Sequence, residues 1–369
     1  MLNKIKQLLK KKQPLKARSD VKVLFLLKRR EDYGIDISYS KDGISTGLLN
    51  SATFVKDMLW ENLNVRTKLS VVKDNNDIDR EVNDYKPTHV IIEALWVVPE
   101  KFDVLQKLHP DVTWIIRYHS EMSFLASEGI AMKWTMQYLT KKNVVLGINS
   151  PRLLNDISGI AKAFGLSEHS IKNKIVYLPN FYPANTSAIP KMYDTDSDTI
   201  NISCFGAIRP LKNQLQQAVA AIRFADLYGK NLRFHINHNR VEMKGEPILH
   251  NIEGLFDAFP KHELVVHEWC KHEDFLAIIA YEIDIGMQVS FSETFNIVAA
   301  DIITMGIPML MSNEVPWAAA GIVNDKESAD MVIGLMSIIE NIEQNVVENN
   351  LYLHEYSKKS QQVWLKYFS

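Results

Sequence analysis

Short apolar runs alternate with longer stretches of helical character along most of the chain. Such runs lie at residues 21–27, 88–94, 112–118 and 144–148, and a second set lies at 200–205, 232–236, 264–267, 283–289 and 307–311. Nearly continuous apolar runs of this length are typical of strands that are buried on both faces of a parallel sheet. Because helical stretches separate them, the pattern predicts an α/β protein with parallel sheets.

A polar stretch rich in turn-forming residues separates the two sets of predicted strands. Pro179 and Pro183 mark its start, and residues 185–199 are mostly polar. This break predicts two Rossmann-like halves that face each other, with ligands bound outside the carboxyl ends of the strands. We therefore expect domains at residues 1–180 and 181–348, followed by a terminal helical segment at 349–369.

The composition is that of a globular protein with room for two domains. The 369 residues are 46% hydrophobic and 23% charged, and no apolar run approaches the roughly 20 residues that span a bilayer. A charged N-terminus without an apolar segment behind it and only two cysteines, Cys204 and Cys270, favour a cytoplasmic protein without disulfides. The net charge of −2 excludes a globally basic nucleic-acid binder but not a local basic patch.

The first 18 residues carry a local concentration of positive charge. They contain seven Lys or Arg and no acid, and Leu2, Ile5, Leu8 and Leu9 recur at helical spacing before Pro14. Three interpretations stay open at this point. The segment is an amphipathic helix on an anionic membrane, an arm that contacts nucleic-acid phosphates, or a solvated terminal helix.

The most informative segment is residues 290–301, where two carboxylates bracket a predicted helix start. Glu293 follows an apolar strand and Asp301 lies eight residues later, which corresponds to roughly 12 Å along a helix. The N–H groups of Thr294, Phe295 and Asn296 are expected to receive an anion between them. This arrangement favours a nucleotide-sugar, with hydroxyls at both ends and phosphate in the middle. The alternative is a pair of solvated helix-capping acids.

The same segment resembles the carboxylate–seven residues–carboxylate signature of retaining glycosyltransferases with the GT-B fold, chiefly glycosyltransferase family 4. The second acid of that family is usually Glu, so Asp301 reaches about one methylene less far. The resemblance implies that Glu293 holds sugar hydroxyls and Asp301 the ribose. It also implies an acceptor-side first domain, a nucleotide-sugar-binding second domain, and a C-terminal helix that crosses back onto the first.

A second match follows the first predicted strand of the second half. Gly206 permits a ligand to approach the backbone, and Arg209 and Lys212 supply two cations that can straddle a diphosphate. Family 4 enzymes carry a Lys six positions after this Gly, as Lys212 does. Their Arg usually follows the Gly directly, where Ala207 stands here. Arg209 therefore either reaches the phosphates from a different place or is structural.

Three further residues complete the predicted site. His119 ends an apolar strand, at the position where the family has a His that leans toward the donor sugar; the alternative is a structural histidine. Gly47 ends a loop, residues 42–47, that resembles the one before the first long helix of this fold, and it lacks the G-x-G-x-x-G of oxidoreductases. Trp269 either stacks on the nucleobase or belongs to the core.

No metal or other cofactor is expected from the sequence. The Asp194-Thr-Asp196 tripeptide has the form of the GT-A metal motif, but it lies in a polar linker rather than at the end of an apolar strand. The histidines of the second half show no compact spacing suited to zinc; they are His235, His238, His250, His262, His267 and His272. The resemblance thus implies a metal-independent hexosyl- or pentosyltransferase that retains configuration, with a UDP-sugar favoured as donor.

For the acceptor, the chain as a whole resembles glycosyltransferases of tailed phages. That resemblance implies a hydroxymethylated base in double-stranded DNA, flipped out of the helix, and an enzyme of the host cytoplasm. Residues 4–18 with Lys28, Arg29 and Arg30 are expected to form a basic rim. Lipopolysaccharide or another surface glycan at a membrane is the alternative acceptor, and a non-catalytic sugar-nucleotide-binding protein is the alternative class. No protein partner is indicated.

Overall fold

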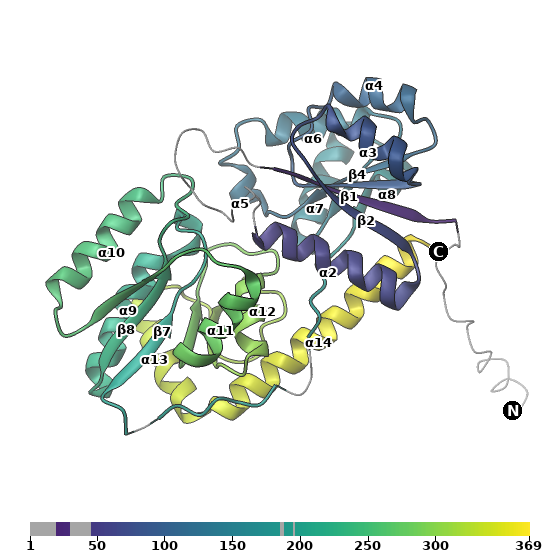
Figure 1. Cartoon of the computed structure of the whole chain (residues 1–369). Helices are drawn as coiled ribbons and strands as arrows, with labels where there is room; N and C mark the ends of the chain where they lie inside the picture. Colours follow the sequence, from purple (N-terminus) through teal and green to yellow (C-terminus); the bar gives the residue numbers. More distant parts are fainter. Residues whose placement is uncertain (1–19, 30–45, 185–187, 195) are drawn as a thin grey trace, which may run out of the picture.

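The computed structural model describes residues 20–29, 46–184, 188–194 and 196–369. Two six-stranded sheets, one in each half of the chain, form its framework (Figure 1). The basic segment at residues 1–18, Arg30 and most of the 42–47 loop lie outside the described residues. Among the described residues, no helix combines the length and the apolar character needed to cross a bilayer.

The first sheet has the order β2-β1-β3-β4-β5-β6, and all its neighbouring strands are parallel. The strands are β1 (Lys22–Lys28), β2 (Arg66–Val72), β3 (His89–Glu93), β4 (Thr113–Tyr118), β5 (Val144–Ile148) and β6 (Ile175–Tyr177). From β1 the chain continues to β2 on one side and then to β3 on the other, so the direction of strand order reverses between β1 and β3. At such a reversal the carboxyl ends of parallel strands leave a crevice.

The helices of this half are α2 (Thr46–Leu63), α3 (Asp77–Tyr85), α4 (Lys101–Leu108), α5 (Met122–Leu125), α6 (Ala131–Thr140), α7 (Pro151–Ala163) and α8 (Glu168–Lys174). They connect successive strands and cover the sheet. The apolar run of β1 shows why both faces need cover: Val23 and Phe25 pack in one buried cluster, while Leu24 and Leu26 pack in another. Alternate side chains of a strand point to opposite faces, so a strand buried on both faces is apolar throughout.

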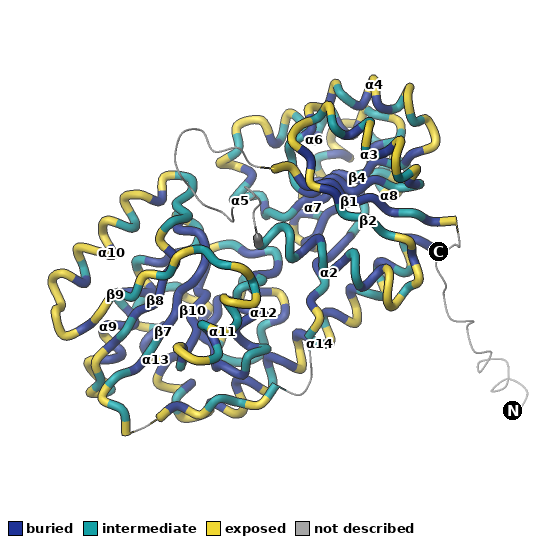
Figure 2. Tube along the Cα trace, viewed as in Figure 1, coloured by how far each residue is buried: buried dark blue, intermediate teal, exposed yellow. Residues whose placement is uncertain are grey.

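The second sheet has the order β12-β11-β10-β7-β8-β9 and is also parallel throughout. Its strands are β7 (Thr199–Ser203), β8 (Asn231–Asn237), β9 (Glu263–His267), β10 (Ile285–Gln288), β11 (Met309–Ser312) and β12 (Ile322–Val323). Its helices are α9 (Gln214–Tyr228), α10 (Glu246–Ala258), α11 (His272–Glu282), α12 (Ile297–Thr304) and α13 (Ser328–Glu340), with a 3₁₀ turn, η1, at Pro210–Lys212. In the tube view, buried segments concentrate in the strands of both sheets (Figure 2).

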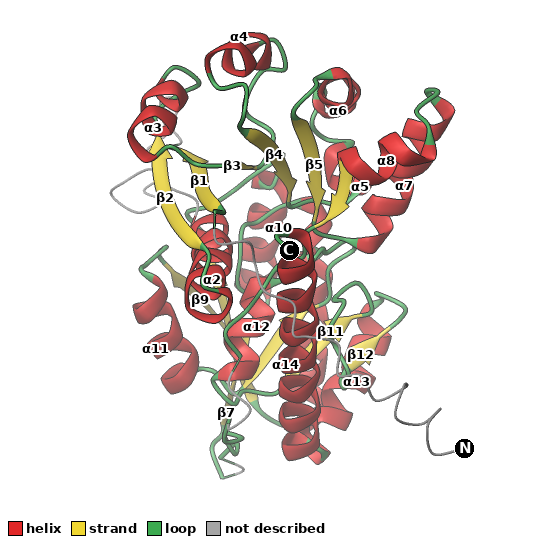
Figure 3. Cartoon of the chain, turned by 90° about the vertical axis from the view of Figure 1, so that its right-hand side faces the viewer, coloured by secondary structure: helices red, strands yellow, loops and turns green. Residues whose placement is uncertain are grey.

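The C-terminal helix α14 (Ile342–Tyr367) connects the two halves, as Figure 3 shows. Leu353 packs in a cluster with α12, whereas Trp364 packs in a cluster with β1. The Trp364 indole N–H also donates to the Pro179 carbonyl at 2.9 Å, and its ring lies 5.5 Å from the Arg117 guanidinium. A helix of this length, about 1.5 Å per residue, is long enough to reach from one half to the other.

The strands β2 and β12 escaped prediction for a physical reason. β2 reads RTKLSVV and is only partly buried, and β12 has two residues; both lie at sheet edges. An edge strand has one unpaired side and does not need a continuous apolar run. The C-terminal helix also begins earlier than the expected 349, because Ile342 and Val346 are buried and extend its apolar face toward the N-terminus.

Candidate active site

Residues from both halves line one cavity of ≈ 520 Å³. A volume of this size is within the range of small-molecule sites in proteins. Every residue predicted from the sequence to bind the donor or to act in catalysis lines it: Gly47, His119, Gly206, Arg209, Lys212, Trp269, Glu293, Thr294, Phe295, Asn296 and Asp301. The structure thus brings the whole predicted set together, while the roles of its members stay predictions.

The acidic loop, residues 289–296, joins β10 to α12 and carries Glu293. The sequence placed the helix start directly after Glu293, and this is wrong: α12 begins at Ile297, with Asn296 as its N-cap at φ 64°. Asn296 accepts from the Ala299 N–H at 3.0 Å, and the Ala300 N–H donates to the Asn296 carbonyl. The N–H groups of Ile297 and Val298, in the first turn of α12, are not engaged by these bonds and remain for an anion, and the predicted 294–296 lie in the loop just before the helix.

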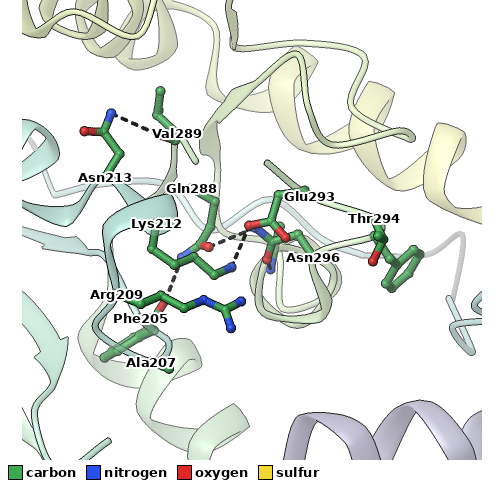
Figure 4. A network of polar contacts seen from close by, with 12 residues as sticks. Phe205, Ala207, Arg209, Lys212, Asn213, Gln288, Val289, Glu293, Thr294 and Asn296 are labelled. Carbon is green, nitrogen blue, oxygen red and sulfur yellow. Dashed lines mark hydrogen bonds and ion pairs between the residues drawn. The ribbon is translucent and has the colours of Figure 1, made fainter. Parts of the chain in front are cut away.

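Glu293 is held by a cation and an amide. Its Oε1 accepts from Lys212 Nζ at 2.6 Å and from Asn296 Nδ2 at 3.1 Å, and the residue is 9% exposed. Asn296 Nδ2 also donates to Gln288 Oε1 at 2.9 Å. In Figure 4 the Lys212 ammonium points toward the Glu293 carboxylate, and the Arg209 guanidinium lies beside it. The pair places one negative and one positive group at the same point of the cavity wall.

The turn that carries Lys212 is tied to the end of β10. Gly206 has φ 116°, a conformation that favours glycine, and its N–H donates to Asn237 Oδ1 at 2.9 Å. Asn213, at φ 57°, donates through Nδ2 to the Val289 carbonyl, and Gln217 accepts from the Val289 N–H at 2.9 Å. These bonds fix the position of Lys212 relative to Glu293 without using either charged group.

Arg209 also reaches the cavity, in spite of its displaced position in the sequence. Its Nη1 lies 3.4 Å from Glu242, and its guanidinium lies 4.8 Å from the centre of the Phe124 ring in the first half. The buried Nε has no partner among the described residues. Nη1 of this guanidinium is therefore engaged, whereas the N–H of the inaccessible Nε stays unpaired within the described part of the chain.

Asp301 lies on α12 and is nearly inaccessible. Its Oδ1 accepts from the Tyr182 hydroxyl and lies beside His272 Nε2, both at 2.8 Å. Burial raises the pKa of Asp301, and the hydrogen bond to Asp301 raises the pKa of His272. The prediction of Asp301 as a ribose ligand did not anticipate these partners. Among the described residues no contact reaches its Oδ2, which is the oxygen left for a ligand.

In the first half, His119 follows β4 and contacts a buried ion pair. Its Nε2 bonds Glu93 Oε2, and Arg117 Nη1 donates to both Glu93 oxygens at 3.2 and 3.3 Å. Burial alone would raise the pKa of Glu93, but Arg117 and His119 hold it below its usual range. Burial lowers the pKa of His119, which favours a neutral imidazole at neutral pH. The structural and the functional interpretation of His119 are therefore compatible.

Contacts across the cavity connect the acidic loop to the first half. Arg152 Nη2 donates to the Glu293 carbonyl at 2.9 Å, and Asn149 Nδ2 donates to the Thr294 hydroxyl at 3.1 Å. The Thr294 hydroxyl donates in turn to the His119 carbonyl at 3.2 Å. The loop that carries Glu293 thus depends on both domains for its position.

The remaining predicted residues lie at the edges of the cavity. A Cβ on Gly47 would lie 3.8 Å from Ile297, so the start of α2 approaches the start of α12. The Arg240 guanidinium lies over the Trp269 ring, 5.0 Å from the ring centre, and the backbone N–H of Trp269 donates to Asn239 Oδ1 at 3.1 Å. One face of the indole is thus covered by a cation that also lines the cavity.

Sequence reasoning missed several residues of the site, namely Glu93, Arg117, Asn149, Arg152, Tyr182 and His272. Glu93 and Asn149 stand at the carboxyl ends of β3 and β5, a position that points to the cleft in any parallel sheet. Arg117 lies on β4, two residues before His119. Arg152, Tyr182 and His272 contact Glu293 or Asp301 across 141, 119 and 29 positions of the chain, respectively. Asp194 and Asp196 are both exposed, the Asp196 N–H donates to Asp194 Oδ1 at 3.0 Å, and neither residue lines the cavity.

No protein-family model matches the chain, and no curated protein matches it significantly. Solved structures do. A trehalose-6-phosphate structure from E. coli bound with UDP-2-fluoro glucose aligns at 9% identity over 94% of this chain and 98% of that one, with a TM-score of 0.65. Sucrose-phosphate synthase from Thermosynechococcus elongatus aligns at 11% identity over 94% of this chain and 98% of that one, with a TM-score of 0.63. The UDP-forming trehalose-phosphate synthase from Burkholderia xenovorans aligns at 12% identity over 80% of this chain and 76% of that one, with a TM-score of 0.61.

These likenesses confirm the predicted fold. Two six-stranded parallel sheets with helices form an α/β fold that matches these GT-B neighbours. At identities of 9% to 12% they establish the fold alone. The link to family 4 and to phage enzymes stays a prediction.

Proposed function

We propose that the protein is a retaining glycosyltransferase that uses a nucleoside-diphosphate sugar, with a UDP-sugar favoured, as donor. The observation that carries the proposal is the Lys212–Glu293 pair, which faces His119 and the first turn of α12 in one cavity of a GT-B fold. A cation, a carboxylate and free N–H groups at one point suit a ligand in which a sugar is joined to a phosphate.

In this proposal the diphosphate lies between Lys212, Arg209 and the N–H groups of Ile297 and Val298. Lys212 exchanges part of its contact with Glu293 for phosphate oxygens, and Arg209, which also lines the cavity, offers its guanidinium group. The N-terminus of α12 adds a favourable dipole. Positive groups fixed in advance stabilise a departing diphosphate without reorganisation at the moment of transfer.

The two ends of the donor fall on the two carboxylates. Glu293 accepts hydrogen bonds from sugar hydroxyls, and the free Oδ2 of Asp301 accepts one from the ribose. Trp269 and the neighbouring loop receive the nucleobase. His119, held neutral beside Glu93, faces the sugar from the first half.

The proposed reaction proceeds on one face of the sugar. The acceptor oxygen forms a bond to the anomeric carbon while the bond from that carbon to the diphosphate oxygen breaks. The acceptor proton passes to the departing diphosphate, and the products are a glycoside and a nucleoside diphosphate. Lys212 and Arg209 supply the positive charge, so we propose that transfer requires no metal ion and continues in the presence of a chelator.

For the acceptor we propose a hydroxymethylated base in double-stranded DNA, on the strength of the resemblance to phage enzymes; the enzyme then acts in the host cytoplasm. The positions of Lys28 and Arg29 support a DNA acceptor. Both are exposed and stand at the carboxyl end of β1, the sheet edge at which Glu93 and His119 also lie. Cations there would contact phosphates beside the cavity, and a base flipped from the helix would bring its hydroxyl to the donor sugar.

The direct experiment incubates the protein with labelled UDP- and GDP-sugars in the presence of hydroxymethylcytosine DNA, unmodified DNA or lipopolysaccharide. Label in the modified DNA alone supports the proposed acceptor, and label in lipopolysaccharide supports the surface-glycan alternative. Donor binding without transfer or hydrolysis would favour a non-catalytic sugar-nucleotide-binding protein. Absence of donor binding would contradict the proposed function as a whole.

The basic rim has its own test in the salt dependence of DNA binding. Arg29→Ala should lower the slope of log affinity against log salt by roughly 0.9 for each phosphate that is no longer neutralised, and removal of residues 1–18 should lower it further. Lys172→Ala is the matched control, because Lys172 lies in α8 just before the amino end of β6. It is therefore at the end of the sheet opposite to the carboxyl ends where Arg29 lies. Loss of binding to anionic vesicles in place of DNA would favour the membrane alternative.

A further inference from the structure

We propose that His235, His267 and Glu282 form a zinc site in the second half of the protein, separate from the cavity. One nitrogen of each imidazole and one Glu282 oxygen lie within 4.8 Å of one another. None of the three residues lines the cavity. The proposal concerns a different site and does not depend on the proposed transfer activity.

The two histidines come from neighbouring strands and share one face of the sheet. In the parallel pairing of β8 and β9, His267 is the partner of Asn237, two residues beyond His235, so both side chains project to the same side. His235 Nδ1 lies 2.8 Å from His267 Nε2, and the two ring planes are inclined by 20° with their centres 5.1 Å apart. Two imidazole nitrogens thus face each other at nearly the separation that a shared ion requires.

A second layer of contacts fixes the tautomer of His235. Asn201 Nδ2 donates to Asp284 Oδ2 at 2.9 Å, so its Oδ1 is left to accept from His235 Nε2 at 3.2 Å. With the proton on Nε2, the lone pair of His235 lies on Nδ1 and points at His267. A carboxylate or amide that orients a histidine in this way is characteristic of metal sites.

Glu282 supplies the third ligand from the last residue of α11. Its Oε2 lies 4.0 Å from His267 Nε2, and its side chain is 44% exposed. A carboxylate at a helix C-terminus faces the negative end of the helix dipole, which is unfavourable without a nearby cation. Among the described residues, His267 is the one ionisable group that pairs with Glu282. A divalent ion would neutralise both the carboxylate and the helix end.

The donor set fits zinc. Two imidazoles and one carboxylate, with water in the fourth position, are a common tetrahedral arrangement, with Zn–N distances of about 2.0–2.1 Å. Two nitrogens at those distances are about 3.3 Å apart in a tetrahedron. The observed 2.8 Å therefore has to open slightly. His267 is partly exposed, so its ring can shift, and its Nε2 proton can move to Nδ1 through solvent.

The position suggests what the ion would do. Zinc would tie the C-terminal end of α11 to β8 and β9. The other end of α11 begins with His272, which contacts Asp301 in the cavity. Phe205 separates the two sites: its ring lies 5.4 Å from His267 and 5.2 Å from Phe275, a cavity residue. The ion would thus hold the helix that presents His272.

The test titrates zinc into chelator-stripped protein by calorimetry, and Co²⁺ serves as the spectroscopic probe. We expect one zinc per chain and the visible absorption bands of four-coordinate Co²⁺. We also expect the Tm to rise by about 5–10 °C when the free zinc concentration is 100 times Kd. His267→Ala should weaken zinc binding by at least about 100-fold and remove the Tm rise, and Glu282→Gln by about 10- to 100-fold. His250→Ala, which alters another histidine of the same half, should leave all three readouts unchanged.

Two results would overturn the zinc site. One is the absence of stoichiometric binding up to millimolar zinc, which would leave a simple hydrogen bond between two neutral imidazoles. The other is binding that His267→Ala does not weaken. Because Glu282 is exposed, Glu282→Gln is expected to fold even if a histidine variant does not, and a circular dichroism spectrum checks each variant. UDP binding by the same samples shows separately whether the proposed donor site is intact.

Discussion

The two carboxylates of the cavity, eight residues apart, have different partners. Glu293 lies in a loop and pairs with the Lys212 ammonium group. Asp301 lies in a helix and pairs with His272 and Tyr182, and the hydrogen bond to Asp301 raises the pKa of His272. The comparison shows that the sugar end of the proposed donor site pairs with a lysine, whereas the ribose end pairs with a histidine that can gain or lose a proton.

The largest effect is expected at the sugar end. Glu293→Gln removes the charge that holds sugar hydroxyls and should lower kcat for transfer by about 10²- to 10³-fold. UDP binding should change little, because Glu293 is proposed to bind the sugar and not the nucleotide. Steady-state transfer assays measure the first quantity and calorimetry the second. Glu327→Gln, an acid before α13 and outside the cavity, is the matched control and should retain full activity.

Lys212→Ala should act on the phosphate instead. Loss of a desolvated cation is expected to weaken binding of the nucleoside diphosphate by about 2–4 kcal/mol while the fold stays intact. Lys230→Ala provides a lysine control in the same half but outside the cavity. Unchanged donor affinity in Lys212→Ala would remove Lys212 from the site and leave its contact with Glu293 as a structural ion pair.

At the ribose end, Asp301→Asn should weaken binding of UDP and of the UDP-sugar alike, by about tenfold, because one charge-assisted hydrogen bond is removed. It should also bring the pKa of His272 down toward its ordinary value of 6.5, because the hydrogen bond to Asp301 is the main cause of its elevation. An NMR titration of the His272 ring measures this. A pKa that stays high in the variant would contradict the pairing.

The smallest effect concerns stability and pH. The pKa of His272 is raised in the folded protein, so the pair stabilises the fold fully below about pH 6.5 and loses that contribution as pH rises through the folded-state value. The difference in unfolding free energy between wild type and His272→Gln should therefore shrink between about pH 6 and pH 9. A difference that grows over that range would have the wrong sign for this account.

The sequence was sufficient for the layout of the fold because buried parallel strands leave a continuous apolar signal, as Val23 to Leu27 does in β1. It also placed Glu293, Lys212 and His119 in one cavity, because the segments that follow the strands of a parallel sheet converge on one edge of it, and the roles of these residues stay predictions. The start of α12 was misplaced although a signal existed: Asn296 directly precedes the apolar run of the helix, as an N-cap does.

Other contacts left no local signal. The Asp301–Tyr182 pair joins residues 119 positions apart, and Arg117 meets Asn180 across 63 positions at 2.7 Å. Spacing along the chain cannot reveal such partners, because tertiary packing brings them together. The His235–His267 pair was missed for the same reason: its spacing of 32 residues has meaning only once β8 and β9 are known to be neighbours.

The comparison of the two carboxylates is tested most directly by calorimetric titration of UDP and of the active UDP-sugar into wild type, Glu293→Gln and Asp301→Asn. The account predicts that Glu293→Gln abolishes the preference for the UDP-sugar over UDP while UDP affinity is kept. It predicts that Asp301→Asn weakens both ligands by the same factor and keeps the preference. Equal loss of UDP binding in both variants, with normal turnover, would contradict the assignment of the two carboxylates.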